Sequence, residues 1–85
     1  MKYKIEFSRP AEKQLADIQK DEIKKIANKI DKLAFNPFPD GHEKLKGHDH
    51  IYRVRQGDYR ILYSVFEKKL TILIVKIGHR REIYR

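Results

Sequence analysis

Apolar and polar residues alternate at the start of the chain and in three segments of its second half. Tyr3, Ile5 and Phe7 alternate with charged residues, which is typical of a strand with one buried face. Three further strand-like segments span residues 51–56, 59–66 and 70–77. Because their connectors are short, we expect antiparallel hairpins. The last segment has apolar residues at both parities, which favours an interior strand covered on both faces.

Between the first strand and the others, the apolar period is that of helices. Ala11, Leu15 and Ile18 are spaced by four and three residues, after an N-cap at Ser8 and a proline at position 10. A second helical stripe follows a break near residue 20 and contains Ile23, Ile26, Ala27, Ile30, Leu33 and Ala34. The stretch NPFPDG ends this helix, since its prolines and glycine cannot continue it. We expect residues 36–50 to form a polar loop.

The predicted order is β-α-α-β-β-β, which indicates an α+β fold. A helical hairpin packed on one face of a small antiparallel sheet buries both apolar surfaces economically. The chain of 85 residues is expected to form a single domain over residues 1–85. Alternation alone leaves open where the N-terminal strand joins the sheet.

The amino-acid composition limits the cellular compartment and the kinds of site that we expect for this protein. The chain has no cysteine, which excludes disulfides and cysteine-based zinc sites. Its start lacks the apolar run of a signal peptide. The longest apolar run, Ile72 to Val75, is far too short to cross a membrane. We therefore expect a cytoplasmic protein that does not contact the membrane.

The charge of the chain is strongly positive and unevenly distributed. The net charge is +8, and residues 41–85 hold 11 basic and 5 acidic residues, a net of +6. The first 40 residues contain one arginine, whereas the remainder contains Arg53, Arg55, Arg60, Arg80, Arg81 and Arg85. Clustered arginines form forked hydrogen bonds to phosphates and carboxylates. Nucleic acid or an acidic protein segment is the expected partner.

The stretch YRVRQGDYR predicts a hairpin with a two-residue turn at Gly57–Asp58. In that register Arg55 faces Arg60, and Arg53 shares their side of the sheet. The other side, expected to pack under the helices, carries Tyr52, Val54, Tyr59, Ile61, Tyr63 and Val65.

Neither strand of this hairpin supplies an acidic residue to the arginine side. Directly opposed like charges on a sheet cost about 0.2–1 kcal/mol. The pattern therefore favours an anion-binding face. The alternative is a set of solvated edge charges that discourage aggregation.

A histidine, a tyrosine and a glutamate are further candidates for catalysis or RNA binding. His79 can exchange protons near neutral pH, or it can simply cap a strand end. Tyr84 can stack on a base, or it can cover the edge of the core. Glu43 can act as a general base if its loop folds over the sheet, and otherwise it is solvated. The motif HDH at 48–50 lacks a clear third ligand, so we predict no metal site.

Three motifs in order, KLKG, YRVRQGDYRILY and KIGHRREIY, resemble the RelE toxins of the RelE/ParE superfamily. The resemblance extends over essentially the whole chain and implies the same element order. It implies the toxin of a type II toxin–antitoxin module that cleaves messenger RNA, without a metal or other cofactor, in the A site of the 70S ribosome. It also implies a cognate antitoxin, encoded by an adjacent gene, in a higher-order complex that binds DNA through the antitoxin.

The resemblance also assigns site residues. It places Arg55, Arg60, Arg80 and Tyr84 at the reacting phosphate, with His79 or Glu43 as the proton carriers. RNA-binding residues are expected to be Arg53, Lys46, Arg81 and Arg85. Well-known RelE relatives have lysines where this chain has Arg53 and Arg55. Since arginine stays protonated, these two positions cannot supply a base here.

Two other functions remain open from the sequence. The ParE branch of the same superfamily implies a non-catalytic inhibitor of DNA gyrase. A plain RNA-binding module without chemistry is the other alternative. The convergent arginines together with a terminal tyrosine favour the nuclease.

Overall fold

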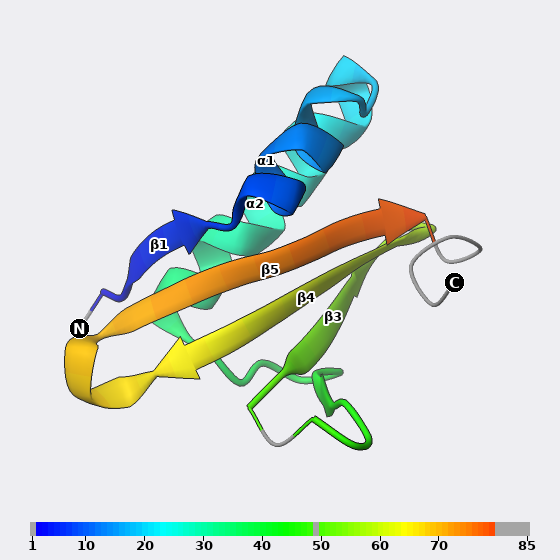
Figure 1. Ribbon diagram of the computed structural model, residues 1–85. Coiled ribbons are helices and arrows are strands. Elements are labelled where there is room, and N and C mark those ends of the chain that lie inside the picture. Colours follow the sequence, from blue (N-terminus) through cyan, green and yellow to red (C-terminus); the bar gives the residue numbers. More distant parts are fainter. Residues whose placement is uncertain (1, 49, 80–85) are drawn as a thin grey trace.

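The computed structural model describes residues 2–48 and 50–79, which form two helices packed on a mixed sheet (Figure 1). The helices are α1 (Arg9–Ala16) and α2 (Lys20–Phe35). The strands are β1 (Lys4–Phe7), β2 (Glu43–Lys44), β3 (Tyr52–Gln56), β4 (Tyr59–Phe66) and β5 (Thr71–His79), with a short 3-10 helix, η1 (Glu67–Lys69), between the last two. The predicted α+β fold is confirmed. Neither helix in these residues is long and apolar enough to cross a membrane.

The helices begin and end where local chemistry predicts. The Ser8 hydroxyl accepts a hydrogen bond from the Ala11 N–H at 3.1 Å and caps α1. Asp21 and Glu22 lie in the first turn of α2, where negative charge interacts favourably with the helix dipole. The second helix ends at Phe35, directly before the NPFPDG stretch.

One face of the sheet packs against both helices. The core contains Ala11 from α1 and Ile26, Ile30 and Leu33 from α2. Strands β3, β4 and β5 contribute Val54, Ile61, Tyr63, Ile72, Ile74 and Ile77. The predicted core side of the hairpin is therefore confirmed, and its arginine side is the opposite face.

The N-terminal strand β1 lies at one edge and pairs in parallel with β5, in the sheet order β1-β5-β4-β3-β2. The other strand pairs are antiparallel, so the sheet is mixed where we expected only antiparallel pairs. Parallel pairing needs a crossover connection, and part of that connection is the helical hairpin. The N-cap residue of α1 and one residue within that helix bind the β5 backbone through their side chains. The Ser8 hydroxyl donates to the Val75 carbonyl at 2.7 Å, and the Gln14 amide oxygen accepts from the Ile77 N–H at 2.7 Å.

Strand β5 contains a β-bulge. Its register changes between Leu62, which pairs with Lys76, and Tyr63, which pairs with Ile74, so that Val75 is the extra residue. Ile74 and Ile77, three positions apart, are consequently both in the core. Because β5 lies between β1 and β4, the prediction of an interior strand is confirmed, but the expected cover on both of its faces is not borne out in the described residues. The bulge explains why Ile77 joins Ile72 and Ile74 in the core, whereas Leu73, which precedes the bulge and pairs with Ser64, lies on the side opposite the helices.

The segment 36–50, expected to be a loop, contains the short strand β2, which pairs with β3. Phe38 and His42 from this segment contact the ring of Tyr52. The buried Tyr63 hydroxyl donates to the Pro37 carbonyl at 2.7 Å. These contacts hold the segment against the sheet, so the expectation of a loop without a strand was wrong.

Candidate functional site

The arginines of the β3–β4 hairpin lie on the sheet face opposite the helices. The register pairs Arg55 with Arg60 and Gln56 with Tyr59, as the two-residue turn predicts. Gly57 has a φ of +60°, a conformation that glycine adopts without strain. Because Val54 and Ile61 are in the core, the alternating arginines project from the other side. We call the side carrying Arg53, Arg55 and Arg60 the arginine face.

Arg60 is the centre of the arginine face. Arg55 is directly opposite it on β3, and Arg53 is its diagonal neighbour. On its other side Arg60 is paired with Gly78 of β5, which has no side chain to occupy the space beside the guanidinium. The Arg60 Nε is buried and has no hydrogen-bond acceptor among the residues that the structure describes. A buried donor without an acceptor is unusual and costly, and an anionic oxygen would supply the acceptor.

Glu43 enters the same face from β2. It is paired in register with Arg53, and its carboxylate accepts a hydrogen bond from the Arg53 guanidinium in an ion pair. The Arg53 side chain is 15% exposed and that of Glu43 is 59% exposed. The acidic residue that neither hairpin strand supplies therefore comes from the neighbouring strand. Glu43 thus lies beside the arginines in the edge strand of the sheet, rather than in a loop folded over it.

Lys76 is a member of the arginine face that the sequence analysis missed. It pairs with Leu62, which in turn pairs with Arg53. Leu62 is only 6% exposed but is not part of the core cluster under the helices, consistent with the opposite side. One row across the face thus reads Glu43, Arg53, Leu62 and Lys76. The sequence did contain a signal for this: Lys76 is a charged residue at a position that alternation from Ile72 and Ile74 would direct into the core, and it directly precedes Ile77.

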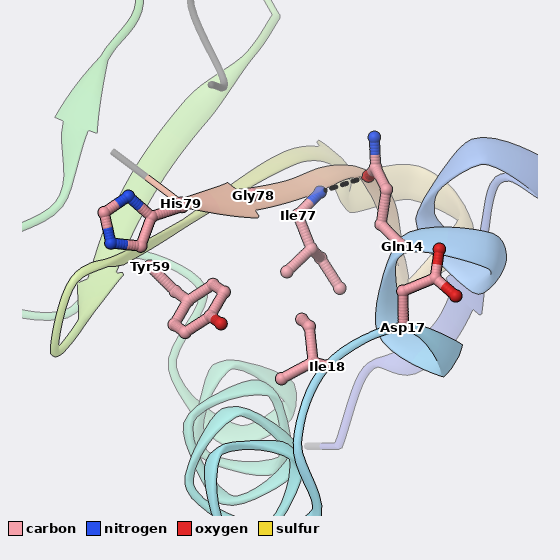
Figure 2. A pocket seen from close by; sticks show the side chains of 7 residues that line it. All are labelled: Gln14, Asp17, Ile18, Tyr59, Ile77, Gly78 and His79. Carbon is pink, nitrogen blue, oxygen red and sulfur yellow. Dashed lines mark hydrogen bonds between the residues drawn. The ribbon is translucent and has the colours of Figure 1, made fainter. Parts of the chain in front are cut away.

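His79 lies on the other side of the sheet. It pairs with Tyr59, and their rings are in edge-to-face contact with centroids 5.8 Å apart. Figure 2 shows both rings at a cavity of about 360 Å³ that α1 also lines with Gln14 and Asp17. The structure therefore does not bring the His79 imidazole together with Arg55 and Arg60.

The remaining predicted site residues divide into two groups. Lys46 is exposed in the turn after β2, away from the paired positions of the arginine face. Arg80, Arg81, Tyr84 and Arg85 lie outside the described residues. Within residues 2–48 and 50–79, no three His, Asp or Glu side chains gather in a way that could hold a metal ion.

Comparison with known proteins gives consistent results. The family model for the ParE toxin of the type II toxin–antitoxin system parDE matches residues 5–84. RelE1 of Methanocaldococcus jannaschii is 35% identical over 88 residues, covering 100% of this chain and 98% of that protein. A chain of the archaeal RelE–RelB complex from Pyrococcus horikoshii is similar with a TM-score of 0.82 and 31% identity, covering 96% of this chain and 99% of that chain. A chain of the RelB–RelE complex from Methanococcus jannaschii has a TM-score of 0.75 and 26% identity, covering 93% of this chain and 94% of that chain.

Proposed function

We propose, since the chain belongs to the RelE/ParE family of type II toxins, that it is an endoribonuclease that stops translation. Its substrate is messenger RNA held in the A site of the ribosome. The reaction needs no metal, and the ribose 2′-OH next to the scissile phosphate is the nucleophile. The products are a 2′,3′-cyclic phosphate and a free 5′-OH.

The observation that carries this proposal is the Arg60 guanidinium, whose buried Nε has no acceptor in the described structure, with Arg55 opposite it. Charge develops on the phosphoryl oxygens as the 2′-OH attacks. Fixed guanidinium groups stabilise that charge without reorganising, and they align the phosphate for attack. Arg53, at the diagonal position, would hold the flanking RNA backbone.

Glu43 is the proposed general base. Arginines stay protonated, so the hairpin itself offers no group that accepts the proton of the 2′-OH. The Glu43 carboxylate lies on the arginine face and is oriented by Arg53, which gives it both position and a fixed geometry. We assign no proton transfer to His79, because it lies on the helix-covered side.

The residues beyond the described part complete the proposal. Arg80 would bind the same phosphate and Tyr84 would stack on a flanking base. Arg81 and Arg85, together with Lys46 in the described turn after β2, would bind the RNA backbone.

The partner proposed for the free toxin is a cognate antitoxin encoded by an adjacent gene. The two solved relatives above were crystallised as complexes of RelE with RelB. The net charge of +6 on residues 41–85 suits an acidic or amphipathic antitoxin segment. We propose that the toxin–antitoxin complex is higher-order and binds DNA through the antitoxin.

The test compares Arg60→Ala with Arg9→Ala, an exposed arginine at the start of α1. Purified toxin is added to ribosomes programmed with a defined mRNA, and the cleavage sites and 3′ termini are mapped. We expect Arg60→Ala to lose about 10²–10³-fold in cleavage rate, the magnitude typical of removing one oxyanion-stabilising donor, while Arg9→Ala cleaves normally. If a folded Arg60→Ala variant cleaves as fast as Arg9→Ala, the assigned site is wrong.

Inhibition of DNA gyrase is the second candidate, because the matching family model is that of the ParE toxin. Expression of the toxin in cells separates the two functions. Transcripts cut within reading frames support the nuclease. Growth arrest in which transcripts stay intact and double-strand DNA breaks appear supports gyrase inhibition instead.

A further inference from the structure

We propose that Lys76 is the general acid of the RNA cleavage reaction. Its ammonium group would donate a proton to the 5′ oxygen as the bond between that oxygen and phosphorus breaks. This assignment rests on the proposed nuclease function and completes it, because Glu43 accounts for only one of the two proton transfers.

The β-bulge places Lys76 where this role requires it. Strict alternation from Ile72 and Ile74 would direct position 76 into the core. The extra residue Val75 shifts the register, so that Lys76 pairs with Leu62 on the arginine face and Ile77 takes the core position. β-Bulges often occur beside active sites, where they redirect one side chain.

The hydrogen bonds that surround the bulge hold this arrangement in place. Gln14 accepts from the Ile77 N–H and Ser8 donates to the Val75 carbonyl, so both neighbours of Lys76 are bound to side chains at α1.

The position of Lys76 relative to the arginines fits a leaving-group donor. Lys76 pairs with Leu62, two residues from Arg60 on β4, so Lys76 and Arg60 are diagonal neighbours. Diagonal neighbours are about 7–8 Å apart, within reach of long side chains. Glu43 is at the opposite end of the same row. The proposed base and acid are thus diagonal neighbours of Arg55 and Arg60, respectively, at opposite ends of one row.

A lysine at this position suits the chemistry of the leaving group. An alkoxide leaving group is a poor one unless it is protonated as it departs. Lysine can release a proton, whereas arginine cannot within the range of protein chemistry. In the proposed step the 2′ oxygen forms a bond to phosphorus and its proton passes to Glu43. The bond from phosphorus to the 5′ oxygen breaks, that oxygen takes a proton from Lys76, and solvent then returns both side chains to their starting states.

The decisive experiment uses two mRNA substrates on the ribosome, one natural and one with sulfur replacing the 5′ oxygen at the scissile bond. A thiolate leaves without protonation. We expect Lys76→Met and Lys76→Arg each to slow cleavage of the natural substrate by about 10²–10⁴-fold, the range typical of general acid catalysis. Both variants should cleave the sulfur substrate at nearly the wild-type rate. The control is Lys69→Met, an exposed lysine in η1, which should match the wild type on both substrates.

Two results would overturn the assignment. A Lys76→Arg variant with wild-type activity on the natural substrate would show that only the positive charge matters. An equal deficit on both substrates, in variants with wild-type circular dichroism and melting temperature, would show a role other than protonation of the leaving group. If instead the wild-type toxin cleaves neither substrate, the nuclease function itself fails, and that outcome is distinct from a failure of Lys76 alone.

Discussion

The hydrogen bond from the Ile77 N–H to the Gln14 side chain provides a quantitative test of how α1 holds the bulged strand. The N···O distance is 2.7 Å, and Ile77 is 1% exposed. Replacing Gln14 with Met keeps the length of the side chain but removes the acceptor. A buried donor left unsatisfied costs about 1–3 kcal/mol. Gln14→Met should lower the free energy of unfolding by that amount, and each kcal/mol lowers the melting temperature by about 4–8 °C in a domain of this size.

The matched control is Gln19→Met. Gln19 is exposed at the N-cap of α2 and its side chain makes no capping hydrogen bond, so its replacement should change the stability by less than about 0.5 kcal/mol. Both variants are measured by urea unfolding followed by circular dichroism. If Gln14→Met is no less stable than Gln19→Met, the Ile77 N–H finds another acceptor and α1 does not anchor β5 through this bond.

Two further predictions concern the core and the hairpin turn. Burial, and secondly the neighbouring Tyr52, raise the pKa of Tyr63 above its ordinary value. The free energy of unfolding should therefore be at its full value below about pH 10 and fall by up to about 1.4 kcal/mol per pH unit above it, because the unfolded chain releases this proton first. Urea unfolding between pH 9 and 12 should show that Tyr63→Phe loses less stability at alkaline pH than the wild type. An identical loss in the two proteins would contradict the assignment. Gly57→Ala should lower the free energy of unfolding by about 1 kcal/mol, because the φ of Gly57 is +60°. Gly57→Asn should lower it by less, because asparagine tolerates that region. Equal losses of the two variants in thermal melts would show that the backbone conformation is not the cause.

The part of the site that follows from local rules could be predicted from the sequence. A two-residue turn at Gly57–Asp58 determines the register of both strands, and alternation then determines which side chains share a face. The pairing of Arg55 with Arg60 needed no further information. The order of helices and strands followed in the same way from apolar periods and from the breakers at the helix ends.

The rest depends on pairings between segments far apart in the sequence. Strand β2 has only two residues, too few for alternation to be recognised, so the place of Glu43 beside Arg53 was not predictable. At the bulge, the backbone groups of Val75 and Ile77 bind Ser8 and Gln14, which lie more than 60 positions away in the chain. Strict alternation from Ile72 and Ile74 would direct Lys76 to the core side, and the bulge reverses this.

The energetics of the arginine face link its structure to its proposed use. The carboxylate of Glu43 offsets the charge of Arg53, but within the described residues no ion pair involves Arg55 or Arg60. Their direct opposition costs about 0.2–1 kcal/mol, and the buried Nε of Arg60 adds the cost of an unsatisfied donor. A bound phosphate would remove both of the penalties that the described residues leave in place. Ligand binding at 100 times the dissociation constant would stabilise the fold by about 2.7 kcal/mol. The same arrangement that weakens the empty sheet would therefore strengthen binding of the proposed RNA phosphate.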